Sequence, residues 1–425
     1  MTAVSDASEQ LTSTRATPAE KRATAVGIVL VLLAAFTFWA FGLDVDSGFE
    51  SQFNLSLPGA RYENLSWVVD SRAVGFIVAL VLAFLGGFIL RRSHLKWTNL
   101  SLSVGLALFV FSFLTWAAAD GAFSFVGMLT STVVLSVPVT LGALTGLMCE
   151  RVAVINIAIE GQLLTSAFVG TIVGSAAGIW VGLFAAMLTG ALLGAVLAVL
   201  AIKYRMDQII AGVVINIFAL GLTSFLARRV LAQSQELNSP GRFGSVKIPF
   251  LGDIPVIGPM FFDHNMFVYI TFILVIALHF GLFYTRWGLR SRSVGEHPKA
   301  ADTVGINVYR TRYRNVILGG VIAGFGGGFL TLAQVSRFEE NLTAGIGFIG
   351  LAALIFGRWR PLGVLAAGLV FGFARALQQK LGILGTPIPS EFLSMTPYIV
   401  TIIVVAGVVG RARPPAADGQ PYIKD

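Results

Sequence analysis

Long runs of apolar residues recur along almost the whole chain and limit it to one class of fold. They extend from Ala25 to Gly410, and a transmembrane helix needs about 20 such residues. The chain is 56% hydrophobic and 12% charged, whereas soluble domains carry about 25% charged residues. These features exclude a water-soluble core and predict an all-α polytopic membrane protein.

The apolar runs predict about twelve transmembrane helices, about nine of them in a core that follows an N-terminal extension of three. We expect them near residues 25–43, 73–90, 98–119, 126–148, 152–175, 178–202, 208–227, 266–285, 315–334, 345–358, 361–380 and 393–410. Residues 1–24 mix both charges with Ser, Thr and Ala, and this composition predicts a disordered tail. The first run is longer than a signal-peptide core of about 7–15 residues, so we expect it to be retained.

Basic residues gather on one side of these predicted spans. They follow spans two, six, eight, ten and twelve, whereas the segment from Asp44 to Asp70 on the other side is net acidic. Positive charge is retained in the cytoplasm, so both termini, including the tail 411–425, are predicted to be cytoplasmic. Arg228 and Arg229 lie on the opposite side and are exceptions to this bias.

The segment 286–314 is the one long polar insertion in the second half of the chain. Seven Lys and Arg residues against Glu296 and Asp302 leave +5 of the net charge of +8. Inside it, Pro298 suits the first turn of a short helix and Gly305 can end it. The small residues Ala300 and Ala301 would let a partner surface approach. A loop that only sets topology remains an alternative at this point.

Glycines recur at four-residue spacing through the predicted core. The sets are Gly142 and Gly146; Gly170, Gly174, Gly178 and Gly182; Gly190 and Gly194; Gly320, Gly324 and Gly328; and Gly368 and Gly372. Small residues at this spacing let helix backbones approach closely in lipid. We therefore expect a tight bundle, with packing as the main role of these glycines.

Polar residues inside apolar spans are candidates for a substrate path, because they are costly in a membrane. Asn156 and Glu160 are four residues apart on one helical face, and Gly161 interrupts the span just before Gln162. Asn216 is a second such position. A weakly broken region from Gly345 to Gly363 is a third, and interrupted segments point to a substrate path. Buried hydrogen bonds that only fix the fold are the alternative.

The longest later loop, 228–265, contains KIPFLGDIPVIGPMFF. Its Pro and Gly residues predict a segment that cannot be helical, and its apolar side chains suggest a cap or a partner surface.

Motifs of enzymes are missing. The sequence has no G-x-x-x-x-G-K-[ST], H-E-x-x-H or G-x-S-x-G motif, so we expect no ATP hydrolysis and no catalytic or metal site on this chain. Cys149 is the only cysteine, which excludes an intramolecular disulfide and a cysteine-based metal cluster within one chain.

Four segments carry a family resemblance. They are GALTGLMCERVAVINIAIEGQLL (142–164), DQIIAGVVINIFALGLTSFL (207–226), VGEHPKAADTVGINVYRTRYRNVILGGVIAGFGGGFL (294–330) and GFIGLAALIFGRWRPLG (347–363). In them the chain resembles permease subunits of bacterial ABC importers for nucleosides and simple sugars, related to ribose and branched-chain amino acid permeases. The family often has Gly where this chain has Ala158. The resemblance covers about residues 129–410, within a predicted permease core of 121–410, and leaves the extension 25–120 outside.

The resemblance implies a machine in the bacterial cytoplasmic membrane with several partners. The first partner is a second permease subunit, with a heterodimer favoured. The others are ATP-binding subunits that bind ATP and Mg, and an extracytoplasmic substrate-binding lipoprotein that meets loop 228–265. It implies a coupling helix with Glu296, Pro298, Ala300, Ala301, Gly305 and Ile306. It places Asn156, Glu160 and Gln162 near the substrate path, and we also count Asn216 and Phe348 among the expected path residues.

A nucleoside is favoured over a simple sugar because the N-I-x-x-E-G and F-G-x-W-x-P-L-G patterns resemble that branch more closely. Two other classes remain open: a secondary transporter with Glu160 as proton carrier, and a polytopic membrane enzyme such as a glycosyl transferase.

Overall fold

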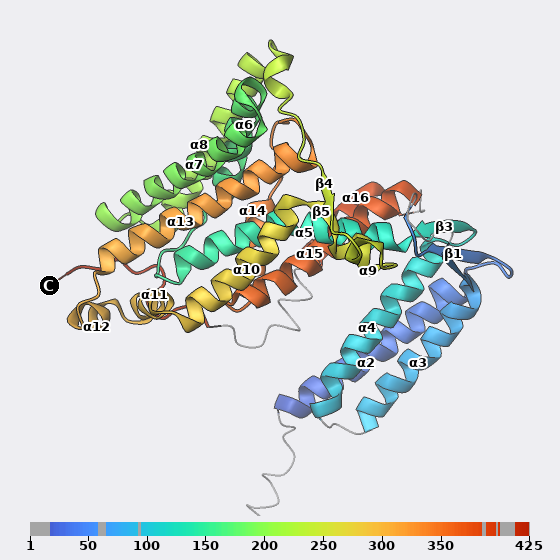
Figure 1. Ribbon diagram of the computed structural model, residues 1–425. Helices are drawn as coiled ribbons and strands as arrows, with labels where there is room; N and C mark the ends of the chain where they lie inside the picture. The colour runs from blue at the N-terminus through green and yellow to red at the C-terminus, as the bar shows by residue number, and fades with distance from the viewer. Residues whose placement is uncertain are drawn as a thin grey trace, which may run out of the picture. The chain divides into compact units, whose positions relative to one another are not determined.

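We analysed a computed structural model of the chain, and we describe residues 18–57, 65–91, 95–384, 388–396, 398–399 and 413–424. The chain divides into two compact units. The first comprises residues 1–125 and the second almost all of the remainder. Helices dominate both units (Figure 1), which confirms the all-α membrane fold class.

The first unit combines three long helices with a small sheet. Its elements are α2 (Pro18–Thr37), the π-helical turn η1 (Phe38–Leu43), β1 (Glu50–Asn54), β2 (Ser66–Asp70), α3 (Ser71–Arg91), α4 (Leu95–Ala117) and β3 (Gly121–Ser124). Strand β1 pairs antiparallel with β2 and parallel with β3. The predicted tail was too long, because residues 18–24 already belong to α2; residues 1–17 of that tail lie outside the described part.

The second unit is a bundle of long and short helices. Its helices are α5 (Phe125–Glu150), α6 (Ile159–Ala177), α7 (Ile179–Ala198), α8 (Gln208–Leu226), α9 (Ile257–Phe261), α10 (Met266–Tyr284), α11 (Arg286–Glu296), α12 (Pro298–Thr303), α13 (Val308–Phe329), α14 (Ile346–Phe356), α15 (Pro361–Leu384) and α16 (Ser390–Ser394). Turns of π-helix extend α7 as η2 (Val199–Lys203), α8 as η3 (Ala227–Leu231) and α13 as η6 (Leu330–Gln334).

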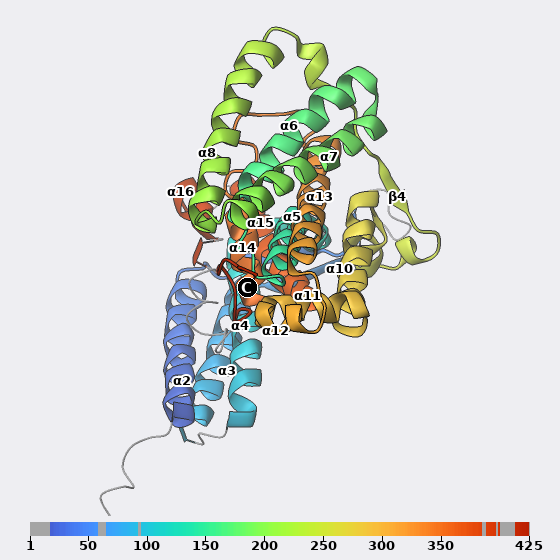
Figure 2. The ribbon, with the colours of Figure 1, turned by 90° about the vertical axis from the view of Figure 1, so that its left-hand side faces the viewer.

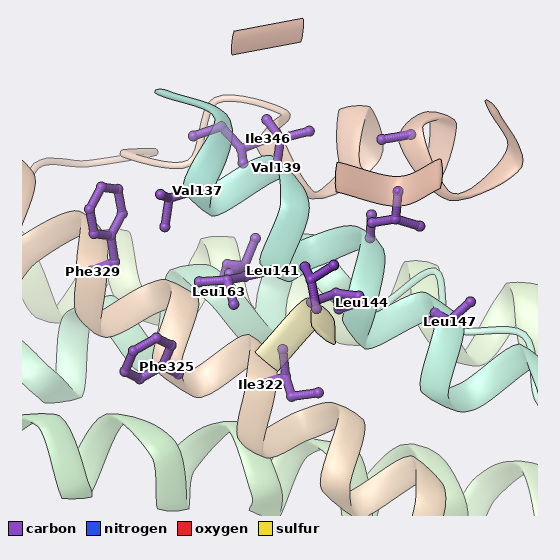
Figure 3. Close-up of a cluster of buried hydrophobic side chains, with 14 of the residues drawn as sticks. Val137, Val139, Leu141, Leu144, Leu147, Leu163, Ile322, Phe325, Phe329 and Ile346 are labelled. Atoms are coloured by element: carbon purple, nitrogen blue, oxygen red, sulfur yellow. The ribbon is translucent and has the colours of Figure 1, made fainter. Parts of the chain in front are cut away.

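Helices α5 and α13 form the centre of this bundle. Their most apolar windows are 94% and 83% buried, whereas α7, α8 and α10 each bury 33%. Figure 2 shows the bundle turned by 90°. Figure 3 shows its interior, where Leu141 and Leu144 of α5, Leu163 of α6 and Phe325 of α13 belong to one apolar cluster. The outer helices therefore present apolar faces that suit lipid or further subunits.

Close backbone packing holds α7 against α13. A Cβ atom on Gly190 would lie 2.2 Å from the carbonyl oxygen of Gly320, and one on Gly324 would lie 2.4 Å from that of Ala186. The predicted packing role is confirmed for these glycines. Gly178 differs, because it has a φ of 98° in the turn between α6 and α7 and a Cβ there would meet nothing within 4 Å.

The described residues contain nine helices that are long and apolar enough to cross a membrane. The sequence had predicted about twelve over the whole chain. The span expected at 345–358 is the 11-residue helix α14, which is short for a bilayer. The span expected at 152–175 begins late, because α6 starts at Ile159. Most of the span expected at 393–410 lies outside the described residues.

The loop 228–265 carries short elements at the end of the bundle opposite α12 (Figure 1). Besides η4 (Gln235–Asn238) and η5 (Leu251–Asp253), strand β4 (Ser245–Lys247) pairs antiparallel with β5 (Asp263–Asn265). The expectation of no helix was wrong for Ile257–Phe261, which form α9. Pro259 is tolerated because it lies in the first turn, where its missing N–H would have no helical partner.

Candidate functional site

A non-helical stretch, residues 151–158, separates α5 from α6 and is the centre of the candidate path. Backbone groups at membrane depth need partners within the protein, and side chains of α8 supply them here. The amide of Ile155 donates to Oε1 of Gln208 at 2.7 Å, and Nδ2 of Asn216 donates to the carbonyl of Ile157 at 2.8 Å. The break is thus held by polar side chains from a neighbouring helix.

Asn216 also contacts the start of α6. The amide of Gly161 donates to its Oδ1 at 2.8 Å. A Cβ on Gly161 would lie 3.0 Å from this oxygen and 2.9 Å from Cβ of Ala219. Glycine therefore allows α6 and α8 to approach, and Asn216 joins the residues on both sides of Ala158.

Asn156 and Gln162 form a fully buried pair. Nδ2 of Asn156 donates to Oε1 of Gln162 at 3.1 Å. Oδ1 of Asn156 and Nε2 of Gln162 have no hydrogen-bond partner within the described part of the chain. Unpaired buried polar atoms are costly, so this pair has unused hydrogen-bonding capacity beside the break.

The carboxylate of Glu160 is bound by the N-terminus of α14. The amide of Gly345 donates to Oε1 at 2.8 Å, and the amide of Gly347 donates to Oε2 at 2.6 Å. Gly345 has a φ of 86°, in the left-handed region, and a Cβ on Gly347 would lie 2.5 Å from the amide nitrogen of Glu160. A helix N-terminus attracts an anion through its free N–H groups and its dipole. Glu160 therefore joins α6 to α14.

Four predicted path residues thus come together around the first turn of α6. Phe348 lies in the first turn of α14, one residue after Gly347, but its side chain is 50% exposed. The backbone amides of Gly345 and Gly347 were not predicted as site groups. The sequence signal for these amides was the repeated glycines of G-I-G-F-I-G. Such glycines indicate a backbone that a ligand or another part of the chain approaches closely.

The short helix predicted within 286–314 is present as α12, at the end of the bundle that also carries α11. Pro298 occupies its first turn, and Nδ1 of His297 accepts a hydrogen bond from the amide of Ala300 at 3.4 Å. After the helix, Gly305 has a φ of 85°, and the amide of Ile306 donates to the carbonyl of Ala301 at 3.0 Å. Both predicted boundaries of this helix are confirmed.

The two alanines of α12 do not share an outward face. Ala301 is 3% exposed and packs with Val294 and Val308, whereas Ala300 is exposed. The expectation that both would meet a partner was wrong for Ala301, because it belongs to the chain's own apolar cluster. Val304, which caps the helix, is 75% exposed and adds an apolar side chain to the outer surface.

The motifs E-R-x-x-V and F-G-R-W-R-P meet each other. Nε1 of Trp359 donates to Oε2 of Glu150, and Nε of Arg151 donates to the carbonyl of Trp359 at 3.0 Å. Burial, together with the nearby charge of Arg292, lowers the pKa of Arg151 to about 10. These contacts connect the end of α5 to the segment before α15, a link that neither motif predicted alone.

The C-terminal residues contribute a buried group that we did not predict. Burial raises the pKa of Asp418 from 3.8 to about 6, and its side chain lies beside Glu150 and Arg312. Arg312 is 1% exposed and donates through Nη1 to the carbonyl of Gln420 at 3.2 Å. The sequence showed only three arginines in the first turns of α13, and which of them is buried is visible only in the structure.

Comparison with known proteins agrees with this architecture. The model of the family "Branched-chain amino acid transport system / permease component" matches residues 128–405. A guanosine ABC transporter permease of Bacillus subtilis is 44% identical over 311 residues, which cover 69% of this chain and 95% of that protein. A nucleoside ABC transporter permease of Lactococcus lactis is 38% identical, with 70% and 96% covered.

A putative glucose ABC transporter permease of Haloferax volcanii is more distant, at 31% identity with 68% of this chain and 93% of that protein covered. No solved structure matches the chain significantly. With the family model covering most of the chain and the membrane-spanning bundle described above, the chain belongs to the branched-chain amino acid transport system permease family and is a multi-pass ABC transporter permease of the bacterial cytoplasmic membrane.

Proposed function

We propose that this permease is the membrane subunit of an ATP-driven importer and that it carries nucleosides into the cytoplasm. The observation that carries this proposal is the 44% identity to a guanosine permease along 95% of that relative, with a nucleoside permease at 38%. These two relatives match 69–70% of this chain, and the family model matches residues 128–405, which lie in the second unit except for a few residues. The transport role is therefore proposed for the bundle, and the N-terminal unit is an addition to it.

In this proposal the energy for transport comes from ATP hydrolysis by another chain. The sequence has no phosphate loop, so ATP and Mg would be bound by a partner ATP-binding subunit. Helix α12 would receive the motion of that subunit, because it is a short helix between α11 and α13 and because Ala300 and the capping residue Val304 are exposed. This assignment puts the α12 end of the bundle in the cytoplasm, as the positive loops predict.

Motion of α12 would reach the candidate path through α13 and α5. Val308 at the start of α13 packs in the same cluster as Ala301. Cys149 in the last turn of α5 and Val152 in the break also belong to this cluster. A displacement of α12 would therefore move the residues next to the break at 151–158. Packed helices of this kind switch between discrete arrangements and do not deform continuously.

Around the break, the amide groups of Asn156 and Gln162 suit a nucleoside better than an ion. Carboxamides can both donate and accept hydrogen bonds, as the edges of nucleobases do, and one amide atom of each is unpaired among the described residues. The exposed ring of Phe348 offers a surface on which a base can stack. A second permease subunit, which we expect to differ in sequence, would complete the path, and a lipoprotein would deliver substrate to loop 228–265.

Uptake measurements test the proposal. The chain is expressed with its neighbouring transporter genes in cells that lack other nucleoside importers, and uptake of radiolabelled guanosine, adenosine, ribose and glucose is compared. We expect nucleoside uptake that needs an intact ATP-binding subunit. Uptake that persists without that subunit would favour an ion-driven carrier, and uptake of sugars alone would favour the second candidate, the sugar permease suggested by the glucose relative.

A substitution at α12 tests the coupling role. Ala300→Trp places a large ring on an exposed position and should reduce uptake while the bundle stays folded. Ile273→Trp is the matched control, because Ile273 is 64% exposed on α10, away from α12 and from loop 228–265. Equal uptake by both variants would contradict a coupling role for α12.

A further inference from the structure

The C-terminal segment, residues 413–424, returns to the start of α12. The amide of Ala417 donates to the carbonyl of Gly295 at 3.0 Å, and the amide of Ala416 donates to Oε2 of Glu296 at 3.2 Å. Figure 1 and Figure 2 both show the end of the chain beside α12. The segment therefore covers the junction between α11 and α12.

Contacts with α12 and α13 fix the remainder of the segment. Tyr422 is 5% exposed, its ring centroid lies 5.3 Å from that of Tyr309, and its carbonyl accepts a hydrogen bond from the hydroxyl of Tyr309 at 3.4 Å. Nζ of Lys424 lies 3.5 Å from Oδ1 of Asp302. With the bond from Arg312 to Gln420, the segment is held by partners along its whole length. Terminal residues are usually poorly ordered unless they are tied down in this way.

A groove runs between α12 and this segment. Its volume is about 360 Å³, and its walls include Glu296, His297, Pro298 and Lys299 on one side and Pro421 and Ile423 on the other. Ile423 is 50% exposed, although the adjacent Tyr422 is buried. The segment thus uses Tyr422 to attach itself and presents Ile423 outward.

We infer that the C-terminal segment and α12 together form the docking surface for the ATP-binding subunit, and that the groove between them receives a side chain of that subunit. The inference rests on the proposed function, and it adds a second wall to the surface that α12 alone would offer. The occupant is the ATP-binding subunit because Pro298 and Lys299, which line the groove, belong to the same short helix as the exposed Ala300. An apolar wall beside polar and charged groups is the composition of a specific protein interface.

The segment also explains how a docked subunit could act on the bundle. It contacts α11 and α12 through Gly295 and Asp302, and α13 through Arg312. In addition, a Cβ on Gly419 would lie 2.8 Å from Ile155, within the break between α5 and α6. A force on the segment would therefore reach the break directly as well as through α12.

Cysteine protection tests the docking surface. Single cysteines are introduced as Ile423→Cys, Val304→Cys and Phe250→Cys, and each protein is labelled with a maleimide with and without its ATP-binding subunit. The native Cys149 is fully buried and gives little background. We expect the bound subunit to slow labelling at Ile423→Cys and Val304→Cys by about tenfold or more, as for side chains inside an interface, and to leave Phe250→Cys unchanged.

The three positions separate the possible outcomes. Protection of Val304→Cys without protection of Ile423→Cys would overturn the role of the C-terminal segment and leave the coupling role of α12 intact. Protection of neither, with the subunit present in the purified complex, would overturn both. Equal slowing at all three positions would show a general effect of the complex and would also overturn the inference.

A second variant gives a functional measure. Ile423→Asp introduces a charge where an apolar contact is expected, and it should weaken binding of the ATP-binding subunit by about tenfold. Because Ile423 is half exposed in this chain, the variant should melt at the same temperature as the parent. Unchanged binding by a folded Ile423→Asp protein would overturn the inference.

Discussion

Replacement of Glu160 by Gln tests whether this buried carboxylate fixes the position of α14. In the parent chain both carboxylate oxygens accept backbone hydrogen bonds, from Gly345 at 2.8 Å and from Gly347 at 2.6 Å. Gln has one acceptor oxygen and one NH2 group. In Glu160→Gln, one of the two amide N–H groups must therefore face a second donor, and the negative charge at the N-terminus of α14 is lost.

The size of the effect follows from these contacts. A hydrogen bond to a charged partner contributes about 1.5–3 kcal/mol, and a buried donor left unpaired costs about 1–3 kcal/mol. An anion at a helix N-terminus contributes about 0.3–2 kcal/mol. Because one neutral hydrogen bond remains, we expect a total loss of about 2–4 kcal/mol. At about 2–4 °C per kcal/mol, the melting temperature should fall by about 4–16 °C.

The assay is thermal unfolding of the detergent-solubilised protein. The fraction that remains folded after heating is measured by size-exclusion chromatography of a fluorescent fusion. Glu236→Gln is the control, because Glu236 is exposed in η4, and it should melt like the parent. Nucleoside uptake is measured in parallel at a temperature where both variants are folded. A Glu160→Gln protein that melts within about 1 °C of the parent but has lost uptake would refute the structural role and favour direct contact with substrate.

Three further outcomes follow from the bundle and its C-terminal segment. Gly190→Ala should destabilise the protein by about 1–3 kcal/mol or more, because the added Cβ would lie 2.2 Å from the carbonyl oxygen of Gly320. Gly221→Ala is the control: its Cβ would meet nothing within 4 Å, so it should not lower the melting temperature. Asn216→Leu removes both hydrogen bonds that flank Ala158 and should lower the melting temperature by several degrees, with hydrogen exchange increasing at residues 151–162. Burial raises the pKa of Asp418 from 3.8 to about 6, so protonation of this carboxyl group stabilises the docked segment. The stabilisation is fully present below pH 3.8 and is lost as the pH rises through about 6. Hydrogen exchange of residues 413–424, corrected for intrinsic rates, should therefore increase with pH in this range, and Asp418→Asn should abolish the dependence.

Much of the fold follows from local patterns. Apolar length predicted the long helices, and Pro298 and Gly305 predicted both ends of α12 because each has a strong local backbone preference. The tight glycine contacts of α7 with α13 were predicted as a class, although their individual partners were not. Local rules failed where a segment depends on its neighbours. A span was predicted at 345–358, where the structure has only the 11-residue α14, and no helix was predicted where α9 forms with Pro259 inside it.

The candidate site was predicted less completely. Asn156, Glu160, Gln162 and Asn216 were found because polar residues in apolar spans are rare and costly. Most of their hydrogen-bond partners were not predicted, because those partners lie many residues away in the sequence. Glu160 binds Gly345 and Gly347, and Asn216 binds Gly161; only Asn156 and Gln162 are close in the sequence. The outward face of α12 was assigned incorrectly for Ala301, since a six-residue helix is too short to show which side is apolar.

The sequence by itself determined that this protein is a helical membrane bundle with a basic connection that contains the short helix α12. It could do so because hydropathy, charge bias and the positions of Pro and Gly act over a few neighbouring residues. Only the tertiary structure decided that the N-terminus of α14 holds Glu160 and that residues 413–424 lie against α12. Both contacts join residues separated by more than a hundred positions. Their energies come from geometry that is created only when the chain has folded, and no local pattern encodes that geometry.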